Sequence, residues 1–169
     1  MRDRKGFTLI EIAVVVFLAG LFLLITIPKF QDITEVNIKS ASRRLSGTIK
    51  YIYNEAAFKK KVYRLAFDIE NGEYWVEILE GNEFVIPGDP SFRRRKLPTG
   101  VYFKDIVTER TREKLVEGDE EFILFTPAGF VEPAVIHLET ETGSAYTIAT
   151  KPYTGGTIVY DEYVELLQK

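Results

Sequence analysis

A glycine, a phenylalanine and a glutamate near the amino end are the residues whose types and spacing could do chemistry together. The segment Lys5-Gly6-Phe7-Thr8-Leu9-Ile10-Glu11 precedes an uncharged apolar run from Ile12 to Ile27. A carboxylate at the start of an apolar helix is costly unless a positive group pairs with it. Cleavage after Gly6 would create such a group, an α-ammonium on Phe7, about one helical turn before Glu11. The spacing therefore predicts a pairing of Glu11 with its own new terminus or with that of a neighbouring chain.

The same segment resembles the class III leader and N-terminal helix of type IV pilins and type II secretion pseudopilins. The resemblance rests on the glycine, the aromatic residue after it, the Thr-Leu-Ile-Glu sequence and the long apolar helix. It implies that a prepilin peptidase cuts after Gly6 and then N-methylates Phe7. It also implies that Glu11 serves docking and register in a growing filament. Gly20 and Pro28 match positions where these helices usually carry a glycine and a proline, and we expect helix bends there.

Three other interpretations of this segment compete with a prepilin leader. A secretory signal peptide fits Arg2, Arg4 and Lys5, but Glu11 would then lie inside the apolar region, and no small-residue cleavage site follows Ile27. A plain signal anchor has the same topology and differs only in that it is not cleaved. A buried helix of a soluble domain is disfavoured, because about 20 residues at about 1.5 Å each match the thickness of a bilayer core.

Charge predicts the orientation of the segment and limits the partners of the chain. Met1–Gly6 carries three basic residues and one acid, so we expect it to stay in the cytoplasm while the rest is exported. The chain has a net charge of −3, and removal of this leader, whose net charge is +2, leaves −5. An acidic balance gives no general attraction to nucleic acid or anionic lipid. The absence of cysteine excludes disulfides and thiolate chemistry.

The remaining candidates for chemistry are better explained as structure. His137 is the one histidine, and without a second ligand or a nucleophile beside it in the sequence we expect a structural role. Gly155-Gly156 lacks the lysine and serine of a phosphate-binding loop and predicts a turn. Two acidic segments, 117–121 and 139–141, offer carboxylates for calcium but lack the alternating spacing of a known loop motif. We predict no catalytic residue, cofactor or metal.

A run of four basic residues, Arg93, Arg94, Arg95 and Lys96, is the strongest local charge in the soluble part. Basic side chains beside an aromatic residue, here Phe92, can bind phosphates or bases. On an acidic domain, such a run is more often a solvated loop or a contact with an acidic neighbour. Some FimT-like pilins bind DNA through a basic C-terminal stretch, whereas residues 156–169 here are mostly acidic and apolar. The run is therefore a candidate contact surface, and nucleic-acid binding is not predicted.

Helical periodicity continues beyond the apolar run. Past Pro28, apolar residues recur every three or four positions, at Ile38, Ala41, Leu45, Ile49, Ile52 and Ala56. This spacing predicts one long helix from about Phe7 to Phe58, apolar in its first half and amphipathic in its second. Pro28 should bend or locally break the helix, because proline lacks a backbone donor and crowds the preceding turn.

After the helix the apolar residues alternate with a period of two. Leu65, Phe67 and Ile69, then Tyr74, Val76 and Ile78, flank the turn Glu70-Asn71-Gly72 and predict a hairpin. Further strands are predicted at 83–86, 101–106, 122–126, 135–139, 145–150 and 157–163, with proline and glycine turns between them. The pattern predicts an α+β fold in which the long helix packs on a small antiparallel β-sandwich or rolled sheet.

The order of these elements resembles the H-class minor pseudopilin of type II secretion, whose domain the FimT-like minor pilins share. The resemblance rests on Phe122-Ile-Leu-Phe-Thr-Pro-Ala-Gly129 and the strands from Ile136 to Tyr160. We expect a cleaved leader at 1–6, a transmembrane and assembly helix at 7–29, the amphipathic half of the helix at 30–60, and a periplasmic β-rich domain at 61–169.

The function that these expectations favour is a structural subunit of the type II secretion pseudopilus, not an enzyme, acting in protein export across the outer membrane. The implied partners are prepilin peptidase, other pseudopilins or pilins, and the inner-membrane assembly platform. The implied location is the inner membrane, crossed once, with the C-terminal domain in the periplasm. Two alternatives stay open: a minor pilin of a type IV pilus, acting in assembly, adhesion or DNA uptake, and a membrane-anchored periplasmic binding or enzymatic domain.

Overall fold

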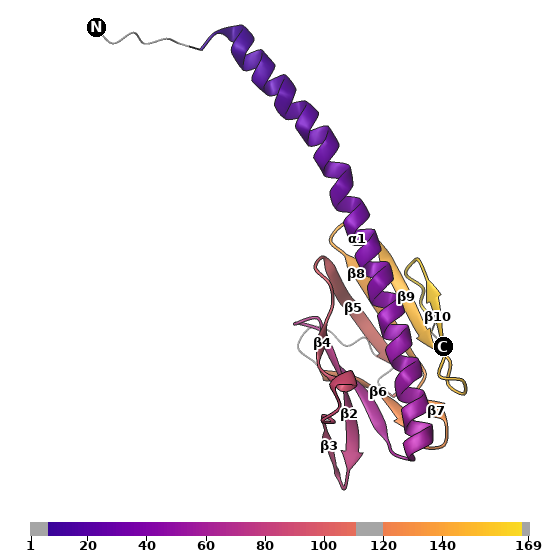
Figure 1. Ribbon diagram of the computed structural model, residues 1–169. Helices are drawn as coiled ribbons and strands as arrows, with labels where there is room; N and C mark the ends of the chain where they lie inside the picture. The colour runs from indigo at the N-terminus through magenta and orange to yellow at the C-terminus, as the bar shows by residue number, and fades with distance from the viewer. Residues whose placement is uncertain (1–6, 111–119, 167–169) are drawn as a thin grey trace. The chain divides into compact units, whose positions relative to one another are not determined.

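The computed structural model describes residues 7–110 and 120–166, with the backbone alone for 24–33 and Glu120. The chain divides into two compact units, Met1–Ile33 and Thr34–Lys169. Its elements (Figure 1) are, in order, α1 (Leu9–Lys59), β1 (Tyr63–Asp68), β2 (Glu73–Glu80), β3 (Glu83–Val85), η1 (Pro90–Phe92), β4 (Arg95–Lys96), β5 (Val101–Thr108), β6 (Glu120–Thr126), β7 (Phe130–Val131), β8 (Ala134–Thr140), β9 (Ala145–Thr150) and β10 (Thr157–Tyr160).

The long helix is present, with ends close to those expected. α1 begins at Leu9 and ends at Lys59, and its backbone is α-helical without interruption through Gly20 and Pro28. No local break therefore occurs at Pro28, where the loss of one backbone donor leaves the neighbouring turns of the helix in place. Bends at Gly20 and Pro28 stay predictions.

The second half of α1 buries the stripe that the periodicity predicts. Each of its members is at most 2% exposed: Ile38, Ala41, Leu45, Ile49, Ile52 and Ala56. Residues at this spacing lie on one side of a helix, so the stripe forms a continuous apolar face. The basic residues between them stay on the exposed side.

The strands of the described residues form two antiparallel sheets. The six-stranded sheet has the order β3-β2-β1-β6-β7, with β4 also paired to β2, and the four-stranded sheet has the order β10-β9-β8-β5. β1 and β2 form the predicted hairpin, with Tyr63 opposite Ile78 and Asp68 opposite Glu73. At its turn, Asp68 accepts a hydrogen bond of 2.9 Å from the Asn71 N–H, and this bond lowers the pKa of Asp68.

Both sheets and the second half of α1 share one core. Edge-on aromatic contacts join the sheets: the ring of Phe103 on β5 lies 5.5 Å from that of Phe67 on β1 and 6.4 Å from that of Tyr74 on β2. Buried residues of α1 and of both sheets belong to the same cluster, and in Figure 1 this part of α1 runs across the strands. The predicted α+β fold is confirmed, with two separate sheets rather than one rolled sheet.

The strand predictions differ from the structure mainly at short or terminal elements. β4 and β7 have two residues each, too few for an alternating pattern to reveal them. The last strand was expected to reach Tyr163 but ends at Tyr160. Beyond Tyr160 the backbone no longer pairs with the backbone of β9 and bonds instead to the Thr147 side chain. The Val164 N–H donates to Thr147 Oγ1 over 2.9 Å, and Thr147 Oγ1 donates to the Glu162 carbonyl over 2.7 Å.

A turn near the C-terminus is fastened to α1 through Tyr53. The Tyr53 hydroxyl lies 2.8 Å from the Tyr153 carbonyl oxygen and 3.1 Å from that of Gly129. Lys50 Nζ donates to the Thr154 carbonyl over 2.6 Å. Gly155 follows with φ of 61°, and a Cβ at this position would lie 2.1 Å from Cγ of Tyr53. Only glycine fits so close to the ring in this backbone conformation.

Candidate functional site

The first turn of α1 positions the predicted assembly glutamate. Thr8 Oγ1 accepts a hydrogen bond of 3.3 Å from the Glu11 N–H, and Glu11 Oε2 accepts one of 3.5 Å from the Thr8 N–H. This reciprocal pair is a capping box, which satisfies backbone donors that the helix itself leaves without partners. The carboxylate of Glu11 therefore lies beside the backbone next to Phe7, whose side chain is 78% exposed. Gly6, the predicted cleavage residue, lies outside the described residues.

The following turns of α1 present apolar side chains on all sides. From Phe7 to Leu23, the large apolar residues are between 49% exposed, at Leu21, and 89% exposed, at Leu9. A helix that is apolar all round is normally buried against other apolar groups. Among the described residues, no helical segment meets the length and hydropathy expected of a membrane span. A Cβ added at Gly20 would meet nothing within 4 Å. Packing within this chain therefore does not require a glycine at this position.

The predicted basic run does not form one patch. Arg94 turns to the six-stranded sheet, where its guanidinium lies 3.8 Å from the centre of the Trp75 ring and 3.2 Å from Glu73 Oε2. Lys96 lines a separate hollow of about 380 Å³ beside Gly100. Successive side chains of a strand point to opposite faces, so Arg95 and Lys96, which form β4, point away from each other.

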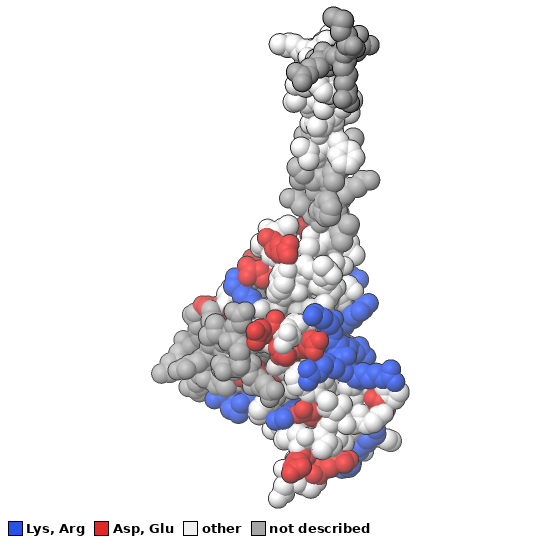
Figure 2. Space-filling view, turned by 90° about the vertical axis from the view of Figure 1, so that its left-hand side faces the viewer, with Lys and Arg blue, Asp and Glu red and all other residues white. Residues whose placement is uncertain are grey.

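Arg95 instead joins basic residues that come from α1. It lines one hollow of about 350 Å³ together with Arg44. Arg44 also lines a second hollow, of about 560 Å³, with Lys39 and Arg43. Figure 2 shows Lys and Arg side chains gathered on one face of the molecule. We call Lys39, Arg43, Arg44 and Arg95 the basic surface.

A buried phenol lies close to the basic surface. Tyr74 is 3% exposed, and burial raises its pKa although Arg95 and Arg44 oppose the shift. A phenol is neutral at pH 7, so Tyr74 does not compensate the positive charge of the two arginines.

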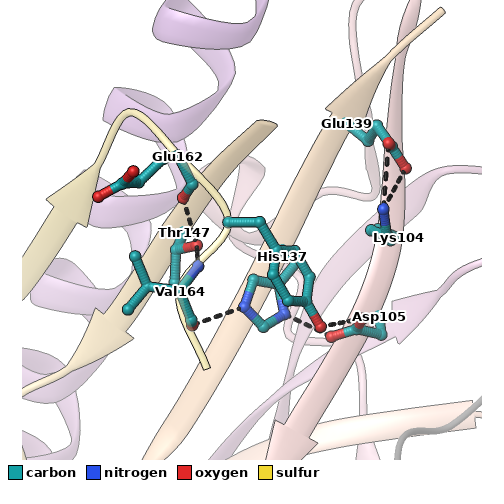
Figure 3. Close-up of polar contacts among 8 residues, drawn as sticks. Lys104, Asp105, His137, Glu139, Thr147, Glu162 and Val164 are labelled. Atoms are coloured by element: carbon teal, nitrogen blue, oxygen red, sulfur yellow. Dashed lines mark hydrogen bonds and ion pairs between the residues drawn. The ribbon is translucent and has the colours of Figure 1, made fainter. Parts of the chain in front are cut away.

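His137 joins the C-terminal segment to the four-stranded sheet (Figure 3). Its ring is 1% exposed, with Nδ1 against Oδ1 of Asp105 and Nε2 3.0 Å from the Val164 carbonyl oxygen. A carbonyl only accepts, so Nε2 carries a proton and donates it. Tyr163 stacks on the imidazole, with ring centres 4.0 Å apart, and its hydroxyl lies 3.2 Å from Oδ2 of Asp105. Both ring nitrogens are occupied, and the geometry gives His137 a structural task.

The described residues of the two acidic segments show no arrangement suited to a metal ion. Glu139 pairs with Lys104 at 3.0 Å, and Glu141 accepts a hydrogen bond of 2.5 Å from the Tyr102 hydroxyl. Residues 117–119 lie outside the described residues. Within the ranges that the structure describes, no three or more histidine, aspartate or glutamate side chains are grouped to hold a metal.

Comparison with known proteins identifies the N-terminal motif and the fold. Residues 1–27 match the family model of the prokaryotic N-terminal methylation motif. No curated protein matches the sequence. The chain thus carries a prepilin-type N-terminus on a pilin-like α+β fold.

The particular fold is that of the minor pseudopilin EpsH from the type II secretion system of Vibrio cholerae. One EpsH structure aligns with a TM-score of 0.58 at 10% identity, over 74% of this chain and 97% of that chain. A second aligns with a TM-score of 0.57 at 10% identity, over 75% of this chain and 95% of that chain. The resemblance that the sequence indicated, to type IV pilin-like prepilins and to the H-class minor pseudopilin, is confirmed.

Two features of the site were not predicted from the sequence. The Thr8-x-x-Glu11 spacing is itself a capping-box signature, so the helix start could have been recognised from it. No short stretch of sequence indicates that Arg95 lies near Lys39, Arg43 and Arg44, because Arg95 and this part of α1 are about fifty residues apart.

Proposed function

We propose that this protein is a minor pseudopilin, a structural subunit of the type II secretion pseudopilus that takes part in protein export across the outer membrane. The observation that carries the proposal is the coincidence, in one chain, of the methylation motif over residues 1–27 and a fold that spans 97% of an EpsH chain. The motif alone would suit any prepilin, and its combination with this fold supports a pseudopilin.

In this proposal, prepilin peptidase removes Met1–Gly6 and methylates the new terminus at Phe7. The α-ammonium of Phe7 then lies next to the Thr8 amide, from which Glu11 already accepts a hydrogen bond in the capping box. A carboxylate held at this place can exchange a neutral backbone donor for a charged one, either its own terminus or that of the adjacent subunit. An unpaired charge is costly in an apolar setting, and charge-assisted hydrogen bonds are directional, so a pair of this kind sets the register between helices.

The helix 7–29 crosses the inner membrane once and later packs among other helices in the filament. Its all-round apolar surface supports this role, because such a surface needs lipid or other helices to cover it. The basic leader stays in the cytoplasm, and the domain formed by the sheets faces the periplasm. Partners are prepilin peptidase, other pseudopilins and the inner-membrane assembly platform.

We propose a structural rather than an enzymatic role. The one histidine is buried in a hydrogen-bonded network and holds the C-terminal segment in place. Its neighbours Asp105 and Tyr163 also bond to each other, so the three side chains form one structural network.

The test of this proposal is leader processing in a host membrane. When the full chain is expressed with prepilin peptidase, its intact mass should fall by the residue masses of Met1–Gly6 and rise by one CH2 unit, because a methyl group replaces a hydrogen at the new terminus. Gly6→Leu should retain the full mass, because a side chain blocks the peptidase at the cleavage residue, whereas Gly20→Ala should be processed normally. A wild-type chain that keeps its leader beside an active peptidase would refute the prepilin assignment.

A further inference from the structure

We propose that the basic surface docks an acidic segment of a neighbouring protein subunit. The inference rests on the proposed function, since it takes the neighbour to be another subunit of the same filament. It adds which face of the domain makes the contact and what chemistry the partner presents there.

The four cations of the basic surface lack the acidic partners that other basic residues of this chain have. Arg64, Arg94 and Arg110 each form an ion pair with a glutamate. By contrast, no ion pair joins Lys39, Arg43, Arg44 or Arg95 to any residue within 7–110 and 120–166. Arg95 contacts neutral groups instead, the Ser91 carbonyl at 3.3 Å and the phenol of Tyr74. The surface is therefore an uncompensated positive site on a chain whose net charge is −3.

The shape of the surface suits inserted side chains. Arg44 borders both hollows, so the two are adjacent parts of one concave region. In the first hollow, Tyr51 and Phe92 form an aromatic wall with tilted rings whose centres are 5.5 Å apart, and Thr48 and Ser91 also line it. Tyr51 stays 41% exposed. The hollow thus combines arginine forks, hydroxyl groups and an apolar wall.

This composition favours a protein carboxylate over a nucleic-acid backbone. The guanidinium fork matches a carboxylate in a bidentate manner, and tyrosine and arginine are the residues that most often dominate protein–protein contacts. Tracking of a phosphate backbone needs cations in an extended row. Here the run 93–96 is divided: Arg94 stacks on Trp75, and Lys96 lines a different hollow. The partner we infer is an acidic segment with an apolar side chain among its carboxylates.

The experiment uses the full chain in a neutral detergent and measures binding by fluorescence anisotropy. The probes are a labelled peptide of four glutamates around one phenylalanine, the same peptide with glutamines, a labelled DNA duplex, and nanodiscs with anionic lipid. Two variants reverse the charge, Arg44→Glu with Arg95→Glu, and Lys39→Glu with Arg43→Glu. A matched control, Lys60→Glu with Lys151→Glu, makes the same change in net charge at residues that line neither hollow.

We expect the glutamate peptide to bind at least about tenfold more tightly than the glutamine peptide. Each variant of the basic surface should weaken this binding by about tenfold, and the control by far less. If the Arg44 and Arg95 variant does not fold, the Lys39 and Arg43 variant decides, because both of its positions are exposed on α1.

Several results would overturn the inference. The first is equal affinity for the glutamate and glutamine peptides, and the second is an equal loss of peptide affinity in the control variant. The third is charge-dependent binding of the duplex or of anionic nanodiscs that is tighter than binding of the glutamate peptide. Salt-sensitive self-association abolished by the same variants would assign the surface to a second copy instead. Leader processing does not involve these residues, so failure of the docking surface and failure of the pseudopilin assignment are separate outcomes.

Discussion

Glu11 combines two tasks that one carboxylate can perform in sequence. In the single chain it caps the start of α1 through the Thr8 amide. In the proposed filament it meets a terminal ammonium, which is a stronger partner for a carboxylate than a neutral N–H. The cap holds the side chain at the helix start and so orients it before assembly. The two tasks can be separated experimentally, because the cap needs only an acceptor oxygen and the filament contact needs a charge.

We predict that Glu11→Gln preserves α1 and membrane insertion but lowers incorporation into filaments by about tenfold or more. The terminal ammonium would then lack its carboxylate partner in an apolar setting. The amide oxygen of glutamine can still accept from Thr8. The measurement is the fraction of subunit recovered with sheared filaments. Thr8→Ala is the matched control: it removes a cap worth about 1 kcal/mol and keeps the charge. Normal incorporation of Glu11→Gln would show that the charge is dispensable.

At the scale of elements, the two parts of the continuous helix α1 have different surfaces. Its first part exposes apolar side chains all round, and its second part buries a single stripe against the sheets. The second part also organises segments that are distant in sequence. Tyr53 and Lys50 hold the turn before β10, and Arg44 lines one hollow together with Arg95 at the start of β4.

The turn held by Tyr53 gives a prediction at this scale. Gly155→Ala should destabilise the domain by about 2 kcal/mol or more, because the added Cβ collides with the Tyr53 ring and the backbone has positive φ. Gly143→Ala is the control: φ there is 85°, but nothing lies within 4 Å of the new Cβ. It should lose only about 1 kcal/mol from backbone strain. Denaturant unfolding of the full chain measures both, and equal losses would contradict the close contact at Tyr53.

At the scale of the whole molecule, an acidic domain follows a basic leader and an apolar helix. In the proposed function, the leader fixes the orientation of the chain, and its removal would take the net charge from −3 to −5, since its own net charge is +2. The core that joins the second half of α1 to both sheets makes the domain one body, so a force on this part of the helix is transmitted to the strands. This arrangement suits a subunit that is pulled from a membrane into a filament.

A deletion in the source organism distinguishes the secretion pseudopilus from a type IV pilus. We predict that loss of the gene reduces export of secreted proteins across the outer membrane by about tenfold or more, with surface pili and twitching motility unchanged. The measurement is the amount of secreted protein in the medium against that retained in the periplasm, with complementation as the control. Normal secretion with loss of pili or of DNA uptake would favour the minor pilin.

The sequence determined the local structure of this protein. Ile38, Leu45, Ile49 and their neighbours repeat at the helical period, and Leu65 to Ile78 alternates around a turn, so each element was specified by contacts along a short stretch of chain. The N-terminal motif is likewise contiguous, and the family model that matches residues 1–27 identifies it without reference to the fold.

Only the tertiary structure decided which distant side chains meet. His137 and Asp105 are 32 residues apart, and Tyr53 and the carbonyl of Tyr153 are 100 residues apart. It also decided that the run 93–96 divides, leaving Arg95 to join the cations of α1. The physical reason is that periodicity fixes which face of an element a residue occupies. The partner across that face depends on sheet order and register, which are set by the packing of the whole core.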